Sequence, residues 1–146
     1  MRLWVTALVL LLITSVHAAP QERFLSKLTL PTGETVVVAE GDFEARSIGS
    51  FSVRLYQAAA APDETTFFTS GLIRARDGVV EKVMLADIDG DQKQEIVVTV
   101  RSVGTGSYLS AHSFAVANGK LLFVAAAEGL AANTDPVAAL RKSRKK

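Results

Sequence analysis

Cysteine is absent from all 146 residues, so no disulfide can form. The fold must therefore rest on its apolar core and does not depend on redox conditions. Histidine is scarce, because His17 and His112 are the only 2 in the chain. His17 lies in a segment that we expect to be removed. A nucleophile–histidine pair would have to use His112, and a metal site with several histidines is excluded.

Net charge is also nearly absent, since 16 basic residues face 15 acidic ones. The basic residues are unevenly placed. Five of them fall in the last six positions, namely Arg141, Lys142, Arg144, Lys145 and Lys146. The body that precedes them therefore has an excess of acidic side chains, and we expect no nucleic-acid partner. The simplest interpretation of residues 141–146 is a solvated basic C-terminal tail.

The N-terminus has the pattern of a secretory signal. A basic start, Met1-Arg2, precedes an apolar run from Leu3 to Ile13, and Val16 and Ala18 supply small residues at a cleavage site. The run is shorter than the roughly 20 residues of a transmembrane helix, which favours a cleaved signal over a membrane anchor. We therefore expect a signal peptide at 1–18, a single domain at 19–140, an extracytoplasmic location and no membrane contact after cleavage.

The rest of the chain alternates between short apolar segments and turn residues, as in an all-β domain. The expected strands are Phe24–Leu30, Glu34–Glu40, Phe43–Arg46, Phe51–Tyr56, Thr65–Arg76, Val79–Leu85, Glu95–Arg101, Tyr108–Ala117 and Lys120–Ala126. Hairpin turns are expected at Asp77-Gly78 and Asn118-Gly119. One helix is expected near the end, capped by Asp135 with Pro136 at its first position. The pattern predicts a mainly β fold, an antiparallel β-sandwich of about eight strands with a short C-terminal helix.

An acidic segment, Asp87–Glu95, has carboxylates at its positions 1, 3, 5 and 9. Such spacing resembles a calcium loop, and a calcium-dependent extracytoplasmic binding or adhesion module is the alternative function. Position 12 is Val98 rather than glutamate, and a strand follows instead of a helix. The competing interpretation is a turn whose aspartates accept hydrogen bonds from backbone amides. We expect no metal and no cofactor.

A second segment, Arg101–Tyr108, contains two glycines, Gly104 and Gly106, followed by Tyr108. No helix is expected after it, which argues against a phosphate-binding loop. A tyrosine beside a glycine loop can be the exposed anchor of an interface. It can equally pack on its own sheet, and the residues alone leave both interpretations open.

Several segments in one order carry a resemblance to a known family. They are Val38–Tyr56, Arg76–Gly78, Ala86–Asp91, Glu95–Val98 and Ser102–Tyr108. With them, the stretch from Phe24 to Ala126 resembles the periplasmic inhibitors of invertebrate-type (I-type) lysozyme. The resemblance implies a periplasmic β-sandwich that is not an enzyme and whose partner is I-type lysozyme. It leaves the oligomeric state open, with a homodimer as one option.

The resemblance also implies which residues bind lysozyme. In that family an exposed loop with a Ser-Gly-x-Tyr core enters the lysozyme cleft, and Thr105-Gly106-Ser107-Tyr108 matches this core. The expected lysozyme-binding residues are Gly104, Thr105, Gly106, Ser107 and Tyr108. Thr105 departs from the family's usual serine; it keeps the hydroxyl and adds a methyl group.

Overall fold

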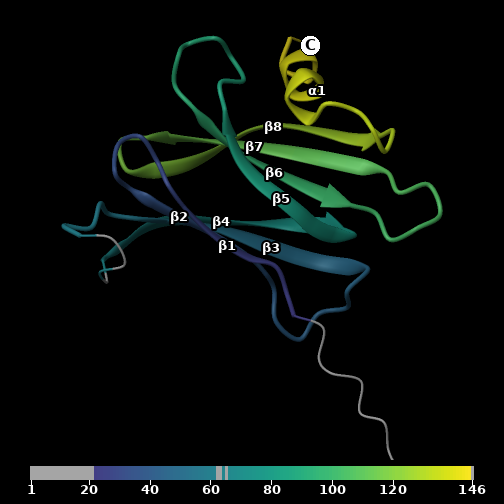
Figure 1. Ribbon diagram of the computed structural model, residues 1–146, viewed down its shortest axis with the longest axis horizontal. Helices are drawn as coiled ribbons and strands as arrows, with labels where there is room; N and C mark the ends of the chain where they lie inside the picture. Colours follow the sequence, from purple (N-terminus) through teal and green to yellow (C-terminus); the bar gives the residue numbers. More distant parts are fainter. Residues whose placement is uncertain (1–21, 62–63, 65, 146) are drawn as a thin grey trace, which may run out of the picture.

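The fold consists of two four-stranded antiparallel sheets with one helix, in a computed structural model that describes residues 22–61, 64 and 66–145 (Figure 1). The first sheet has the order β1-β2-β3-β4 and the second has the order β5-β6-β7-β8. The strands are β1 (Leu25–Thr29), β2 (Thr35–Glu40), β3 (Ile48–Tyr56), β4 (Phe68–Asp77), β5 (Val79–Ala86), β6 (Glu95–Arg101), β7 (Leu109–Ala117) and β8 (Lys120–Leu130). The helix α1 spans Pro136–Ser143. The predicted sandwich of about eight strands is therefore confirmed.

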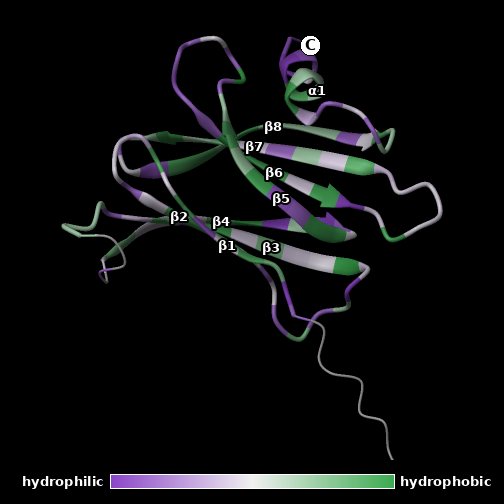
Figure 2. Ribbon diagram, in the orientation of Figure 1, coloured by the Kyte–Doolittle hydropathy of each residue, from purple (hydrophilic) through white to green (hydrophobic). Residues whose placement is uncertain are grey.

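The core lies between the two sheets and follows from alternation along the strands (Figure 2). In β3, Phe51, Val53 and Leu55 are fully buried while the residues between them are only partly covered. The strand β6 differs, because every residue from Glu95 to Val100 is buried. Both faces of β6 are covered, and its sequence is accordingly apolar without alternation.

One face of β6 packs in the core between the sheets, and the helix α1 covers the other face, on the outer side of the second sheet (Figure 1). Asp135 caps the helix by accepting a hydrogen bond from the Val137 amide at 2.9 Å, and Pro136 occupies its first turn, as predicted. Leu140 is fully buried in a cluster with Val97 and Ala111. The helix therefore holds the outer face of the second sheet through a small apolar cluster of its own.

The two predicted hairpin turns have different outcomes. Asn118-Gly119 joins β7 to its partner β8 with positive φ angles of 51° and 70°, as a type I′ turn requires. Asp77-Gly78 forms no hairpin, because β4 pairs with β3 and β5 pairs with β6. Gly78 instead carries the chain from one sheet to the other, and a Cβ atom there would lie 2.1 Å from the carbonyl oxygen of Arg101. Close passage over a neighbouring strand is the reason for this glycine.

A second expectation, a short strand at Phe43–Arg46, is also wrong. These residues form a turn between β2 and β3, and Phe43 has a φ of 59° with its side chain fully exposed. The turn passes close to Gly78, whose amide donates to the Ser47 carbonyl at 2.8 Å. Side-chain contacts, rather than strand pairing, hold this segment.

The buried guanidinium of Arg76 makes the main contacts with this turn, beside Gly78, where the chain crosses from the first sheet to the second. Arg76 donates to the carbonyl oxygens of Ser50, Arg46, Gly78 and Ala45 at 2.9, 2.8, 2.5 and 3.0 Å. These carbonyls belong to the turn before β3, to β3 itself and to the crossing residue. One buried side chain thus satisfies backbone acceptors of the turn and of the crossing residue, and it adds a second donor to the Ser50 carbonyl, which also accepts from the Gly41 amide.

Two glutamates complete this polar cluster. Glu44 lies 3.6 Å from Arg76 and accepts hydrogen bonds from the amide and hydroxyl of Ser50. Those two hydrogen bonds, and then the charge of Arg76, hold the pKa of the Glu44 carboxyl below its usual value. Glu40, buried on β2, pairs with Arg46 at 2.8 Å and accepts from the Val80 amide on β5. Glu40 therefore bonds the first sheet to the second.

The described part of the chain begins at Glu22 and ends at Lys145. The predicted signal peptide at 1–18 lies outside the described residues. No helix among the residues that the structure describes is long and apolar enough to cross a membrane. At the other end, α1 continues through Ser143, so it includes residues that we expected in the basic tail.

Replacing the buried guanidinium provides a test of this architecture. We expect Arg76→Met to lower the free energy of unfolding by about 3 kcal/mol or more, because it removes a hydrogen-bond donor from several backbone carbonyls and the ion-pair partner from the Glu44 carboxylate. Urea denaturation of the purified protein measures the change. Arg144→Gln is the control, since its ion pair with Asp89 is partly exposed and should matter little. A loss for Arg76→Met no larger than that of the control would contradict the assignment.

Candidate functional site

The connection between β6 and β7 is an exposed loop at one end of the sandwich (Figure 1). Its exposed residues include all those expected to bind lysozyme, Gly104, Thr105, Gly106, Ser107 and Tyr108. The Tyr108 side chain is 56% exposed, so it projects into solvent instead of packing on its own sheet. This exposure argues against packing on its own sheet, and the role of Tyr108 as an interface anchor stays a prediction.

Hydrogen bonds within the loop give it a defined shape. The Ser102 amide donates to the Tyr108 carbonyl at 2.9 Å and closes the base of the loop. Nearer the tip, the Ser107 amide donates to the Gly104 carbonyl at 3.1 Å, and the Gly104 amide donates to the Ser102 hydroxyl at 3.2 Å. The loop is therefore a small bonded structure in the free protein, which reduces the entropy lost on binding.

The two glycines of the loop have different roles. A Cβ atom at Gly106 would lie 2.4 Å from the Tyr108 ring, so the ring lies directly against the backbone of Gly106. A Cβ atom at Gly104 would meet only the Ser102 hydroxyl, at an ordinary 3.5 Å. A side chain at position 106 would therefore force the Tyr108 ring to move, whereas Gly104 keeps the tip slim.

Arg101, at the end of β6, lies at the foot of the loop and was not among the expected site residues. It donates to both carboxylate oxygens of Glu81 on β5, the shorter contact being 2.8 Å. It also donates to the carbonyls of Ser107 and Ala132, each at 3.0 Å. The pairing of Val80 with Val100 brings their chain neighbours Glu81 and Arg101 close together, so the contact could be predicted once the β5–β6 register is known.

A hollow of about 480 Å³ lies beside Tyr108 and reaches His112 between the sheets. Burial lowers the pKa of His112, its ring meets Phe51 edge-on at 5.4 Å, and its Nδ1 has no hydrogen-bond partner among the described residues. A nucleophile–histidine pair would need a hydroxyl or a carboxylate bonded to this ring. His112 is therefore a core side chain rather than half of a catalytic pair.

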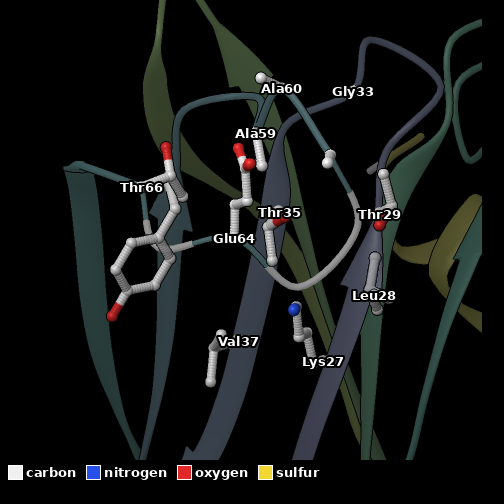
Figure 3. A pocket seen from close by; sticks show the side chains of 12 residues that line it. Lys27, Leu28, Thr29, Gly33, Thr35, Val37, Ala59, Ala60, Glu64 and Thr66 are labelled. Carbon is white, nitrogen blue, oxygen red and sulfur yellow. The ribbon is translucent and has the colours of Figure 1, made fainter.

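A larger hollow, of about 790 Å³, lies at the opposite end of β3 (Figure 3). Figure 3 shows Lys27, Thr35 and Glu64 around it. Glu64 is the only carboxylate among its described lining residues, so the pair of carboxyl groups used in glycoside hydrolysis is missing here. Tyr56 lines this hollow half-buried, because the alternation that buries Leu55 sends the next residue to the other face.

The acidic segment forms a turn whose carboxylates bind its own amides, as the second interpretation predicts. Asp87 accepts from the Gly90 and Gln92 amides, and Asp89 accepts from the Asp91 amide. The hydrogen bond from Asp91 is the main reason that the pKa of Asp89 is lowered. Asp87, Asp89 and Glu95 nevertheless bring ligand atoms within 4.8 Å of one another, so they are the residues that could hold a cation.

Two of these carboxylates have further partners. Glu95 accepts from the Ile88 amide at 2.7 Å, and burial raises the pKa of its carboxyl. Arg144, the C-cap residue of α1, contacts Asp89 at 2.7 Å, and Arg141 within the helix donates to the Asp87 carbonyl. The helix therefore supplies positive charge where a cation would otherwise bind.

Comparison with known proteins agrees with these observations. The model of a family described as periplasmic lysozyme inhibitor of I-type lysozyme matches residues 22–144. A crystal structure of such an inhibitor from Aeromonas hydrophila is 42% identical, with a TM-score of 0.72, and the match covers 80% of this chain and 98% of that one.

A second structure shows Aeromonas hydrophila inhibitor in complex with Meretrix lusoria lysozyme. It is 41% identical with a TM-score of 0.73, and the match covers 84% of this chain and 99% of that one. No curated protein matches the chain. The family match, the identity and the shared fold over nearly the whole length of the solved relatives lead to one conclusion: this chain belongs to the family of periplasmic lysozyme inhibitors of I-type lysozyme.

Proposed function

We propose that this periplasmic inhibitor of I-type lysozyme blocks its target by inserting the loop Gly104–Tyr108 into the active-site cleft. The observation that carries the proposal is the exposed Tyr108 ring, held against Gly106 at the end of a hydrogen-bonded loop. A large, rigid aromatic side chain with a polar tip is a typical interface anchor. The protein is not an enzyme; it acts by occupying a site on one.

The chemistry of the target explains why such a loop suits it. Lysozymes hydrolyse glycosidic bonds with carboxyl groups that line a cleft. A competitor therefore needs hydrogen-bond donors on a narrow, stiff support. Thr105 and Tyr108 carry hydroxyl groups, and the glycines add no side chains that would widen the tip. The Aeromonas inhibitor, which has been captured bound to a lysozyme, shares the fold that presents this loop.

The calcium-dependent module is not supported by comparison. Asp87, Asp89 and Glu95 already accept hydrogen bonds from amides of their own turn, and Arg144 neutralises Asp89. A calcium ion would have to displace these partners, and the segment lacks the bidentate glutamate of an EF-hand loop. We therefore interpret this turn as structural, a support for α1.

Truncating the anchor tests the proposal directly. We expect Tyr108→Ala to weaken binding to I-type lysozyme by roughly 2 kcal/mol or more, as at interface hot spots. Its melting temperature should change little, because the ring is mostly exposed in the free protein. Titration calorimetry and inhibition of cell-wall lysis measure binding, and thermal denaturation measures stability.

Tyr56→Ala is the matched control for this experiment. Tyr56 packs edge-on against Phe68 at 6.0 Å, away from the loop, so its loss should lower stability and leave binding by the folded protein intact. If Tyr108→Ala lowers stability while the folded fraction inhibits normally, the inhibitory surface lies elsewhere.

Thr105 tests the contribution of the loop hydroxyl. We expect Thr105→Ala to weaken lysozyme binding by about 1 kcal/mol, the typical worth of one hydroxyl contact, and Thr105→Ser to be nearly neutral. Thr32→Ala, an exposed threonine in the β1–β2 turn, controls for the loss of a surface hydroxyl. Equal affinities for the alanine variant and the wild type would show that this hydroxyl makes no contact.

Calcium dependence provides a test against the alternative function. We expect neither calcium nor a chelator to change the melting temperature or lysozyme inhibition, for the reasons given above. Scanning calorimetry over a series of calcium concentrations is the measurement. A melting temperature that rises steadily with calcium would reveal a site in the native state, because a ligand that binds only that state stabilises it.

A further inference from the structure

We infer that Arg101 is a positioning residue for the inhibitory loop: it fixes the backbone around Tyr108 without touching lysozyme. This inference rests on the proposed function, since it assigns a residue that prepares the same surface. Arg101 stands where three segments meet. Its guanidinium bonds Glu81 on β5, Ser107 in the loop and Ala132 in the connection from β8 to α1.

The contact with Ser107 acts next to the anchor. The Ser107 carbonyl, which accepts from Arg101 Nη1, belongs to the peptide group that precedes Tyr108. The carbonyl of Tyr108 itself accepts from the Ser102 amide at 2.9 Å. Both peptide groups that flank the anchor are thus held, one by a side chain and one by the base of the loop. Their orientations fix the direction in which the Tyr108 Cα–Cβ bond points.

The backbone of Ser107 also requires a restraint. Its φ of 44° lies in the left-handed region, which is unfavourable for a residue with a side chain. Such a conformation persists only where surrounding contacts determine it. Two hydrogen bonds hold this conformation: the Ser107 amide donates to the Gly104 carbonyl, and the Ser107 carbonyl accepts from Arg101. Without Arg101, the loop would exchange this conformation for others.

The donors of Arg101 are already used within this chain. Nε and Nη2 bond Glu81, at 3.1 Å for Nε and at 3.0 and 2.8 Å for Nη2, and Nη1 bonds the two carbonyls. All three guanidinium nitrogens are therefore engaged by acceptors within this chain. Glu81 accepts from two nitrogens of the fork, which sets the plane of the guanidinium and aims Nη1 at Ser107.

Stability alone does not explain this arrangement. The side chains of Arg101 and Glu81 are 26% and 43% exposed, and ion pairs at that exposure add little to the free energy of unfolding. A restraint on a binding loop acts on affinity instead, because the apparent dissociation constant rises as the competent conformation becomes less populated. Arg101 should therefore affect lysozyme binding much more than folding.

The first test compares binding with stability. We expect Arg101→Gln to raise the dissociation constant for I-type lysozyme about tenfold, mainly through slower association. This is the change expected if the loop conformation that binds lysozyme falls to about a tenth of the population. Amide hydrogen exchange in residues 103–108 should accelerate while the melting temperature stays near that of the wild type. Glu81→Gln, which keeps Arg101 but weakens its orientation, should have a smaller effect in the same direction.

Arg144→Gln is the matched control for these variants. The Arg144–Asp89 pair has a similar length, 2.7 Å against 2.8 Å, and similar exposure, but it lies away from the loop. Its removal should leave binding and loop exchange unchanged. If Arg101→Gln lowers the melting temperature and the folded protein binds as the wild type does, Arg101 is only a structural residue. The inference is then wrong.

A double-mutant cycle separates positioning from direct contact. If Arg101 acts through Tyr108, adding Arg101→Gln to Tyr108→Ala should cost little further affinity. Fully additive losses would mean that Arg101 contributes independently of the anchor, which would overturn the inference. If Tyr108→Ala alone has no effect, the proposed function fails; if Tyr108→Ala weakens binding and Arg101→Gln does not, only the inference fails.

Discussion

The passage of the chain from one sheet to the other depends on a buried cluster of charge at one end of the sandwich. Backbone groups at such a crossing leave both hydrogen-bonded ladders and need other partners. Arg76 supplies donors to the carbonyls, and Glu40 accepts the Val80 amide on the far side. Gly78 then passes against the Arg101 carbonyl, at the foot of the Gly104–Tyr108 loop. The position of that loop relative to the first sheet therefore depends on these contacts.

The sequence predicts those parts of the fold that local interactions determine. The alternation of Phe51, Val53 and Leu55, the Asp135 cap and the Asn118-Gly119 turn each depend on residues a few positions apart, and the structure contains them all. Asp77-Gly78 has the same local signal as Asn118-Gly119 but a different outcome. Its neighbours in space, Arg101 and Ser47, are distant in sequence, and no local pattern could indicate them.

In the candidate site, too, local sequence predicts some features and tertiary contacts determine the others. The spacing of Gly106 and Tyr108 marks the loop in the sequence, and the contact between ring and glycine gives that spacing a physical reason. Whether Tyr108 faces solvent or its own sheet depends on tertiary packing, which composition and periodicity do not contain. Arg101 and Glu81 are 20 positions apart, and Glu81 sits at the bulge of the β5–β6 ladder, where the register shifts between Val80 and Lys82. Their meeting becomes visible only when the register is known.

The order of strands has a consequence for how the protein assembles after export. Each ladder joins strands that are consecutive in the chain, β1 to β4 in one sheet and β5 to β8 in the other. Every pairing therefore closes a short loop, so the contact order stays low for a β-sandwich, and low contact order favours fast folding. Because the chain has no cysteines to pair, its sheets can form one hairpin at a time in the periplasm without an oxidant or a disulfide isomerase.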